Sequence, residues 1–395
     1  MARRARRHVA PPAVPALGLY IHVPFCSAIC HYCNFNRELL DDGLKRRYVD
    51  AAIAEIRSAP VRLGLGAAPA VDTIFFGGGT PSLLAGCEIG AILDACRERF
   101  SVAAGAEVTI EANPETVSVP ALAAYRHAGV NRISVGVQSF RGEELRRLGR
   151  IHDVARARQA VAQAREAGFD NLSLDLMMWL PEQSVAQWLE SVEAAIDAGP
   201  EHLSLYMLEL YPNAPLREDM ARAGWSQAPD EDAAEMYEQA MARLEGAGYL
   251  QYEISNVARP GRQSRHNLKY WRDDEWVGIG PGAHSTVAGQ RWKNVSATDQ
   301  WTARIEAGAP TDVERRVLTP EERWQEALIT GLRLTEGIDL ESFRQKYGLD
   351  IEARYGDHLR PYLDEGLALL DAGRLRLRLS RRGMLVANEV LLVFL

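Results

Sequence analysis

The segment YIHVPFCSAICHYCNF, residues 20–35, carries an apolar run directly before three closely spaced cysteines. The run GLYIHVP (18–24) has the dense apolar pattern of a β-strand that is covered on both faces. Cys26, Cys30 and Cys33 follow with C-x3-C-x2-C spacing, in what we expect to be the loop after this strand. The segment therefore predicts a metal site at the carboxyl end of a strand.

Five further strand-like runs follow, and helical patterns separate them. They are DTIFFGGG (72–79), AEVTIEANP (106–114), RISVGVQ (132–138), NLSLDLMM (171–178) and HLSLYMLEL (202–210). Intervening stretches such as 44–59 and 154–168 place apolar residues three and four positions apart, as amphipathic helices do. Six such repeats predict an α/β fold, a partial (β/α)6 TIM-like barrel whose parallel strands collect the chemistry at their carboxyl ends.

We expect the chain to divide into three parts. Residues 1–17 are rich in arginine and proline and are predicted to be a disordered basic tail, because prolines stand where a secretory signal would be apolar. Residues 18–310 form the barrel, which becomes irregular after Gly248. Residues 311–395 are mostly helical and end in a hairpin-like run and an apolar helix (375–395), which predicts a small winged-helix-like C-terminal domain.

The composition excludes several classes of protein. The 53 acidic residues outnumber the 45 basic ones and give a net charge of -8, so no basic surface for nucleic acid is expected. No apolar run approaches the roughly 20 residues that span a bilayer, although peripheral membrane contact stays open. Three of the five cysteines fall within eight positions, which does not resemble a disulfide framework and favours a reducing cytoplasm.

The three clustered cysteines are one ligand short of the four that a structural zinc site or a ferredoxin cluster uses. A [4Fe-4S] cluster held by three cysteines leaves one iron open to a small molecule. The alternatives are a zinc site completed by His31 and cysteines that are close by chance. Cys87 and Cys96 lie in a helical pattern, and we expect both to be buried packing residues.

The segment YIHVPFCSAICHYCNF resembles the signature of the radical S-adenosylmethionine (SAM) superfamily. The resemblance implies a [4Fe-4S] cluster on Cys26, Cys30 and Cys33, with SAM on the open iron and reductive SAM cleavage as the accessible chemistry. It also implies a set of SAM contacts, most of them at strand ends. These are Tyr20, Gly78, Gly79, Thr80, Glu111, Gln138, Arg150 and Asp175.

Over about residues 18–395 the chain resembles the coproporphyrinogen III oxidase-like branch of that superfamily, which includes a decarboxylating enzyme of porphyrin biosynthesis and heme chaperones. The oxidases carry a fourth cysteine two positions after the third, where this chain has Phe35. They also have a longer N-terminal region, whereas only 18 residues precede Leu19 here. Both differences favour the heme chaperones.

The motif RHNLKYW (265–271) resembles the H-N-x-x-Y-W motif of the heme chaperones. The resemblance implies His266 as an axial heme ligand, with Tyr270 and Trp271 offering flat apolar surface to a porphyrin. His284 is a weaker alternative. The stretch DLMMWLPEQS departs from the branch, because Trp179 and Glu182 stand where glycines are usual.

The function implied by these resemblances is that of a heme chaperone. Such a protein carries [4Fe-4S] and SAM and passes heme, its cargo, to an apo-hemoprotein acceptor such as a respiratory enzyme. An electron donor is implied as a further partner. The alternatives are oxygen-independent coproporphyrinogen III oxidase and a related radical SAM methyltransferase.

Overall fold

The computed structural model describes residues 16–395 except positions 213, 372 and 374. The predicted tail, residues 1–17, lies outside the described residues apart from its last two positions, and Leu17 already belongs to the first strand. Within the described part of the chain, no helix is long and apolar enough to cross a membrane.

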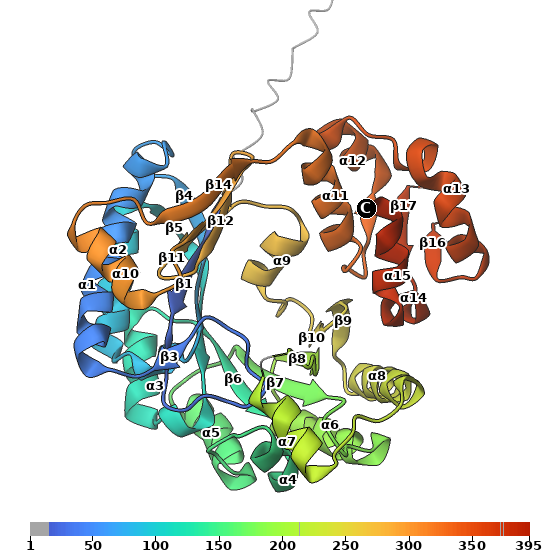
Figure 1. The fold of residues 1–395 in the computed structure, drawn as a ribbon, viewed down its shortest axis with the longest axis horizontal. Coiled ribbons are helices and arrows are strands. Elements are labelled where there is room, and N and C mark those ends of the chain that lie inside the picture. The colour runs from blue at the N-terminus through green and yellow to red at the C-terminus, as the bar shows by residue number, and fades with distance from the viewer. Residues whose placement is uncertain (1–15, 213, 372, 374) are drawn as a thin grey trace, which may run out of the picture.

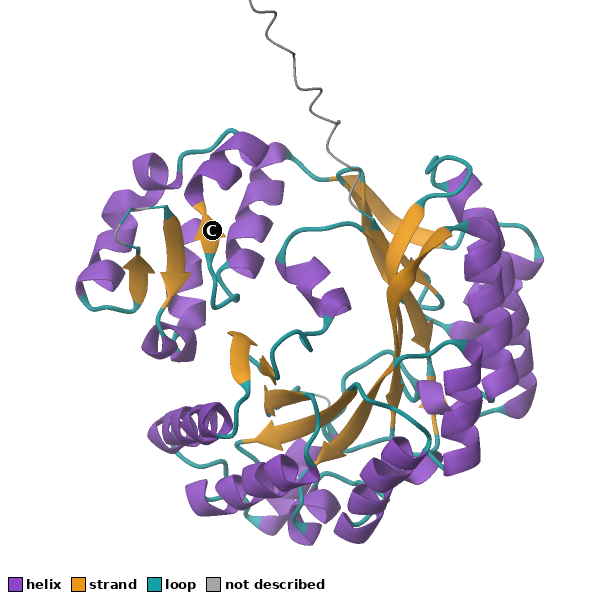
Figure 2. Ribbon diagram, turned by 180° about the vertical axis from the view of Figure 1, so that it is seen from behind, coloured by secondary structure: helices purple, strands orange, loops and turns teal. Residues whose placement is uncertain are grey.

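Six parallel strands form the centre of a curved sheet, as the sequence predicts. They pair in the order β1 (Leu17–Val23), β4 (Ala70–Gly78), β5 (Ser101–Ala112), β6 (Arg132–Gln138), β7 (Leu172–Met178) and β8 (His202–Met207). Helices cover the outer face of this sheet (Figure 2). They are α1 (Asp42–Arg62), α2 (Gly86–Arg99), α3 (Val119–Ala128), α4 (Gly142–Arg147), α5 (Val154–Glu166) and α6 (Val185–Ala198), followed by α7 (Pro215–Ala223) and α8 (Asp230–Gly246).

The segment expected to be irregular extends the sheet at both edges. At one edge β11 (Trp276–Ile279) runs parallel to β1 and is followed by antiparallel β12 (His284–Val287), β13 (Gln290–Asn294) and β14 (Asp312–Val317). At the other edge lie β10 (Asn256–Ala258) and β9 (Leu250–Glu253). Helix α10 (Thr298–Glu306) packs on α1. The large sheet thus continues past residue 310, where we expected the second domain to begin.

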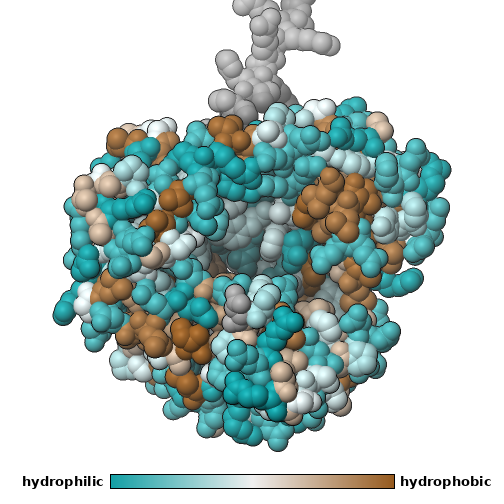
Figure 3. Space-filling view, in the orientation of Figure 1, coloured by the Kyte–Doolittle hydropathy of each residue, from teal (hydrophilic) through white to brown (hydrophobic). Residues whose placement is uncertain are grey.

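The barrel does not close, and a short helix lies in its open side. This helix, α9 (Arg265–Trp271), contacts β4 on one side and the C-terminal domain on the other (Figure 1). In the same orientation, the molecular surface is hollowed at its centre between the barrel and that domain (Figure 3). Helix α9 carries the RHNLKYW motif, so the motif lies at the barrel opening.

The C-terminal domain has a hydrophobic core of its own. Its elements are α11 (Pro320–Gly331), β15 (Ile338–Asp339), α12 (Leu340–Tyr347), α13 (Ile351–Asp364), β16 (Ala368–Leu370), β17 (Arg376–Leu379), α14 (Arg381–Leu385), α15 (Ala387–Leu391) and η3 (Leu392–Phe394). Leu328, Leu377 and Phe394 lie in this core. The three strands form one small sheet beside the helices, in the order β15, β17, β16.

The two faces of the barrel strands differ in chemistry. Along β6, Ile133, Val135 and Val137 belong to the apolar core beneath the helices. Arg132 and Ser134 alternate with them and line a cavity inside the barrel. Because side chains alternate across a strand, this pattern gives the barrel a polar interior.

Candidate functional site

The cysteine loop is fixed to the barrel by backbone hydrogen bonds. The short strand β2 (Phe25–Cys26) pairs with β3 (Glu38–Leu39) and closes the loop at its base. The Cys33 N–H donates to the Cys30 carbonyl at 3.2 Å, and the His31 N–H donates to Leu148 at 3.1 Å. These contacts hold Cys26, at the end of β2, and Cys30 and Cys33, in the loop that follows, in one small region.

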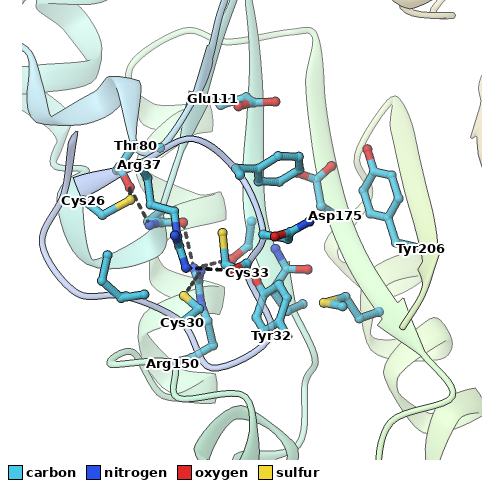
Figure 4. A pocket seen from close by; sticks show the side chains of 18 of the residues that line it. Cys26, Cys30, Tyr32, Cys33, Arg37, Thr80, Glu111, Arg150, Asp175 and Tyr206 are labelled. Atoms are coloured by element: carbon cyan, nitrogen blue, oxygen red, sulfur yellow. Dashed lines mark hydrogen bonds between the residues drawn. The ribbon is translucent and has the colours of Figure 1, made fainter. Parts of the chain in front are cut away.

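All three cysteines line one cavity of about 490 Å3 at the carboxyl ends of the barrel strands (Figure 4). Of the predicted SAM contacts, seven line the same cavity. They are Gly78, Gly79, Thr80, Glu111, Gln138, Arg150 and Asp175. Tyr32, Arg37 and Tyr206 line it as well, and no local sequence pattern marks them as site residues. The cysteine spacing and the family resemblance thus named ten of the residues that line this cavity, and their role in binding a cluster and SAM stays a prediction.

A chain of hydrogen bonds connects two of the cysteine sulfurs. The Thr80 hydroxyl lies 3.6 Å from Cys26 Sγ and donates to it, and Asn113 Nδ2 donates to Thr80 Oγ1 at 3.1 Å. Arg150 Nη2 donates to Asn113 Oδ1 at 2.7 Å, and Arg150 Nη1 donates to Cys30 Sγ at 3.4 Å. We call Thr80, Asn113 and Arg150 the sulfur relay.

The glycine-rich end of β4 is required by close packing. Gly78 has φ +115°, and a Cβ atom there would lie 2.6 Å from the His22 ring. The N–H of Gly78 donates to Glu111 Oε2 at 3.1 Å. The next two N–H groups, of Gly79 and Thr80, donate to carbonyls of the first strand and the cysteine loop. Glycine at these positions therefore lets β4 approach the loop that carries the cysteines.

Two carboxyl groups, on β5 and on β7 at either side of β6, face the cavity. Burial, together with the charge of Asp175, raises the pKa of Glu111 to about 8. Burial also raises the pKa of Asp175, although Ser134 donates to its Oδ1 at 3.0 Å. A neutral Glu111 at pH 7 reduces the negative charge of the cavity wall.

Comparison with known proteins decides the family. The profile described as "Radical SAM superfamily" matches residues 20–195, and "HemN C-terminal domain" matches residues 318–386. The chain is 38% identical to heme chaperone HemW of Escherichia coli strain K12, over 97% of this chain and 99% of that one. It is 35% identical to heme chaperone HemW of Bacillus subtilis, over 95% and 98% of the two chains.

This chain belongs to the HemW family. A solved structure of E. coli coproporphyrinogen III oxidase (HemN), described as a radical SAM enzyme, matches with a TM-score of 0.83 and 24% identity over 96% of this chain and 90% of that one. That likeness shows the fold, a radical SAM TIM-like barrel with a C-terminal helical domain. Membership in the radical SAM superfamily implies a [4Fe-4S] cluster and SAM.

The cavity fits such a cluster in its donor set. Burial raises the pKa of Cys26 to about 11 and also raises that of Cys33, so thiolates form here only beside positive charge or iron. Among the described residues, no three Cys, His, Asp or Glu side chains converge as they would around one metal ion. A four-iron cluster does not need such convergence, because each cysteine binds a different iron.

The remaining predicted residues of this HemW-family chain lie deeper in the barrel. Tyr20 does not line the cysteine cavity, and its hydroxyl lies 3.1 Å from His22 Nδ1. His266 is 1% exposed; its Nδ1 lies 2.9 Å from Thr73 Oγ1, and its Nε2 lies 2.9 Å from the Tyr270 hydroxyl. Burial lowers the pKa of His266 to about 3, so the imidazole is neutral. Both of its nitrogens are engaged in this conformation.

Trp271 and His284, the other aromatic and histidine candidates, do not line the cavity inside the barrel that His266 lines. Trp271 packs under the Arg333 guanidinium, 4.5 Å from the ring centre, at the junction with the C-terminal domain. His284 is exposed and begins β12. One packing prediction was wrong: Cys96 is buried, but Cys87 is exposed, because it faces outward in the first turn of α2.

The structure explains the two departures after β7. Trp179 and Glu182 have φ +61° and +58°, which lie in the left-handed region that favours glycine. This backbone conformation accounts for the glycines that are usual at these positions in the branch. The Trp179 indole donates to the Ala228 carbonyl at 2.7 Å, and Glu182 accepts from the Ser226 N–H at 2.8 Å. These hydrogen bonds offset the backbone strain and join two loops at the barrel mouth.

Proposed function

We propose that this chain is a heme chaperone that carries a [4Fe-4S] cluster and SAM and transfers heme to an apo-hemoprotein. The observation that carries the proposal is the 33–38% identity to proteins named heme chaperone HemW, along nearly the whole length of both chains. Phe35 supports it, because it lies on the cavity wall at the position of the fourth cysteine of the decarboxylating enzymes.

We infer that Cys26, Cys30 and Cys33 ligate the cluster and that Glu111, Gln138 and Asp175 are among the SAM contacts, with Tyr20 behind them. When bound, the cluster and SAM supply one-electron chemistry. The residues of the chain hold and shield that site. Arg150, half-buried between Asn113 and Cys30, places positive charge beside one of these proposed ligands.

Anaerobic reconstitution tests the ligands directly. We expect Cys30→Ala to lose bound iron, sulfide and the brown absorbance. Cys87→Ala serves as the matched control, because its thiol is exposed and distant from the cavity. Full iron content in the Cys30→Ala protein would exclude this ligand set.

The proposal that His266 ligates heme has a structural requirement. Its two nitrogens are held by Thr73 and Tyr270, so ligation requires α9 to shift or one hydrogen bond to break. Removing a partner should then free a nitrogen. We expect Tyr270→Phe to bind hemin more tightly than wild type if Nε2 is the ligand, and Thr73→Val to do so if Nδ1 is the ligand.

Heme transfer tests the function itself. Hemin-loaded protein should reconstitute an apo-hemoprotein faster than free hemin does. His266→Ala should alter the Soret band and lose this gain while retaining the iron–sulfur absorbance, and exposed His127→Ala should behave as wild type. Consumption of coproporphyrinogen III by protein that binds no heme would overturn the chaperone proposal in favour of the oxidase. The identity of the acceptor, the electron donor, membrane contact and the cytoplasmic location stay predictions.

A further inference from the structure

A second, smaller chamber lies inside the barrel behind the cysteine cavity. It has a volume of about 180 Å3. The two share Glu111, Asp175 and Tyr206 as wall residues, so the chamber adjoins the cavity that we propose for SAM. Arg132 and Ser134 from β6 and His266 and Tyr270 from α9 complete much of its wall. We call this space the inner chamber.

Arg132 is the unusual residue of the inner chamber. Its side chain is among the largest that are fully buried, with 2% of its surface exposed. Its Nε has no hydrogen-bond partner, and the guanidinium forms no hydrogen bond or ion pair with any residue that the structure describes. A buried charge without a partner is strongly destabilising. Arg150, by contrast, is half-buried and its two terminal nitrogens donate to three acceptors.

The neighbouring side chains do not neutralise this charge by contact. Glu111 and Asp175 feel the positive charge of Arg132, which lowers their pKa values, but burial outweighs it and both pKa values are raised. His266 is neutral, so it neither repels nor attracts strongly. Ser134 and Ser204 add hydroxyl groups to the same wall. The inner chamber therefore combines a guanidinium that forms no hydrogen bond with a neutral imidazole, hydroxyl groups and two carboxyl groups whose pKa values are raised.

We propose that the inner chamber binds a carboxylate group of a ligand and that Arg132 is its partner. A guanidinium presents a planar fork that matches a carboxylate through two parallel hydrogen bonds. The volume suits a short carboxylate arm and excludes a porphyrin ring. The carboxylate comes from a propionate arm of heme or from a free small acid; the first source rests on the proposed function, and the second does not.

Two measurements on cluster-loaded protein distinguish these sources. The first compares hemin with hemin dimethyl ester, in which both propionates are esterified. Wild type should bind hemin at least about tenfold more tightly, and Arg132→Met should lose that difference. The second compares melting temperatures in sodium propionate and sodium chloride at equal ionic strength, because a ligand that binds the native state raises the melting temperature.

Two further variants keep the test decisive. Arg132→Lys retains the charge but lacks the fork, so it should lose most of the preference for the carboxylate even if Arg132→Met folds poorly. Arg360→Met is the control, because Arg360 is exposed and pairs only with exposed Asp357 on the C-terminal domain.

The two measurements distinguish the two sources of the carboxylate. Ester discrimination that depends on Arg132 assigns the carboxylate to heme, and propionate stabilisation that depends on Arg132 without ester discrimination assigns it to a small acid. If neither effect differs between wild type and the Arg132 variants, the inference is wrong, and water alone solvates the guanidinium. If wild type binds no hemin, the proposed function fails, and the propionate measurement alone decides the inference.

Discussion

The hydroxyl of Thr80 connects the glycine-rich strand end to a proposed cluster ligand. It donates to Cys26 Sγ while accepting from Asn113, so it is the first member of the sulfur relay. Hydrogen bonds to ligating sulfurs stabilise the more negative, reduced state of an iron–sulfur cluster and so raise its reduction potential. The relay would therefore raise the potential of a cluster that Cys26 and Cys30 ligate, without contacting iron.

Replacing Thr80 by valine removes the hydroxyl and conserves the shape. A neutral hydrogen bond contributes about 1 kcal/mol, so we expect the potential of the reconstituted cluster to fall by roughly 40 mV. Potentiometric titration followed by electron paramagnetic resonance measures it. Thr302→Val is the matched control, because Thr302 is buried in α10, distant from the cysteines, and donates only within its helix. Equal shifts in both variants would contradict a role for the relay.

Single residues show where sequence reasoning ended. The cysteine spacing and the polar residues at strand ends predicted part of the cavity wall because both are local patterns, whereas Arg150 was implied only by the resemblance to a known family. Asn113 was visible at a strand end, but its bridging role depends on Thr80 and Arg150, which are 33 and 37 residues away. The sequence indicated only that Arg132 begins a strand, because no local pattern shows that a buried guanidinium lacks a partner.

Among the elements, α9 determines what the barrel interior contains. Its His266 ring and Lys269 stem pack against Gly18 of β1, where an added Cβ would lie 3.1 Å and 3.0 Å from them. The absence of a side chain on β1 thus allows α9 to enter the barrel opening. Because hydrogen bonds hold both nitrogens of His266, α9 has little freedom to move away from β1.

Gly18→Ala should therefore destabilise the fold by about 1–3 kcal/mol through overpacking. Chemical denaturation measures the free energy of unfolding, and hydrogen exchange should show faster exchange in the α9 amides. Gly105→Ala is the control, since a Cβ there meets nothing within 4 Å. A Gly18→Ala protein as stable as the control would show that α9 moves aside at little cost.

The sequence predicted the six parallel strands and missed most of the strands that extend them. Long apolar runs identify strands that are buried on both faces. Strands β12 to β14 are short and alternate polar residues with only a few apolar ones, so in sequence they resemble loops. A turn at Gly289 joins β12 to β13, whereas α10 lies between β13 and β14. Their pairing is fixed by the neighbouring strand rather than by their own composition.

At the scale of the whole molecule, an ion pair between a buried carboxylate and a half-buried guanidinium joins the barrel to the C-terminal domain. Glu253 at the end of β9 is fully buried, and Arg333, which follows α11, lies 3.3 Å from its Oε2. The same arginine stacks on Trp271 of α9. Three parts of the chain therefore meet at one guanidinium.

Arg333→Met should cost about 3 kcal/mol of unfolding free energy, because it leaves a buried carboxylate without its partner. Burial raises the pKa of Glu253 above the value of the unfolded chain. Protonation of Glu253 removes the unpaired charge in the variant. The loss of unfolding free energy relative to wild type should therefore be smaller near pH 5 and grow as the pH rises. Denaturation at several pH values measures this. Adding Glu253→Gln should recover much of the loss, and a deficit independent of pH would contradict the argument.

The outward position of Cys87 has a practical consequence. Of the five cysteines, three line the proposed cluster site and Cys96 is buried, so Cys87 is the one exposed thiol. Once iron occupies the other three, a maleimide dye should label this position alone without any engineered mutation. Heme absorbs visible light strongly, so energy transfer from that dye would report cargo arriving and leaving in real time.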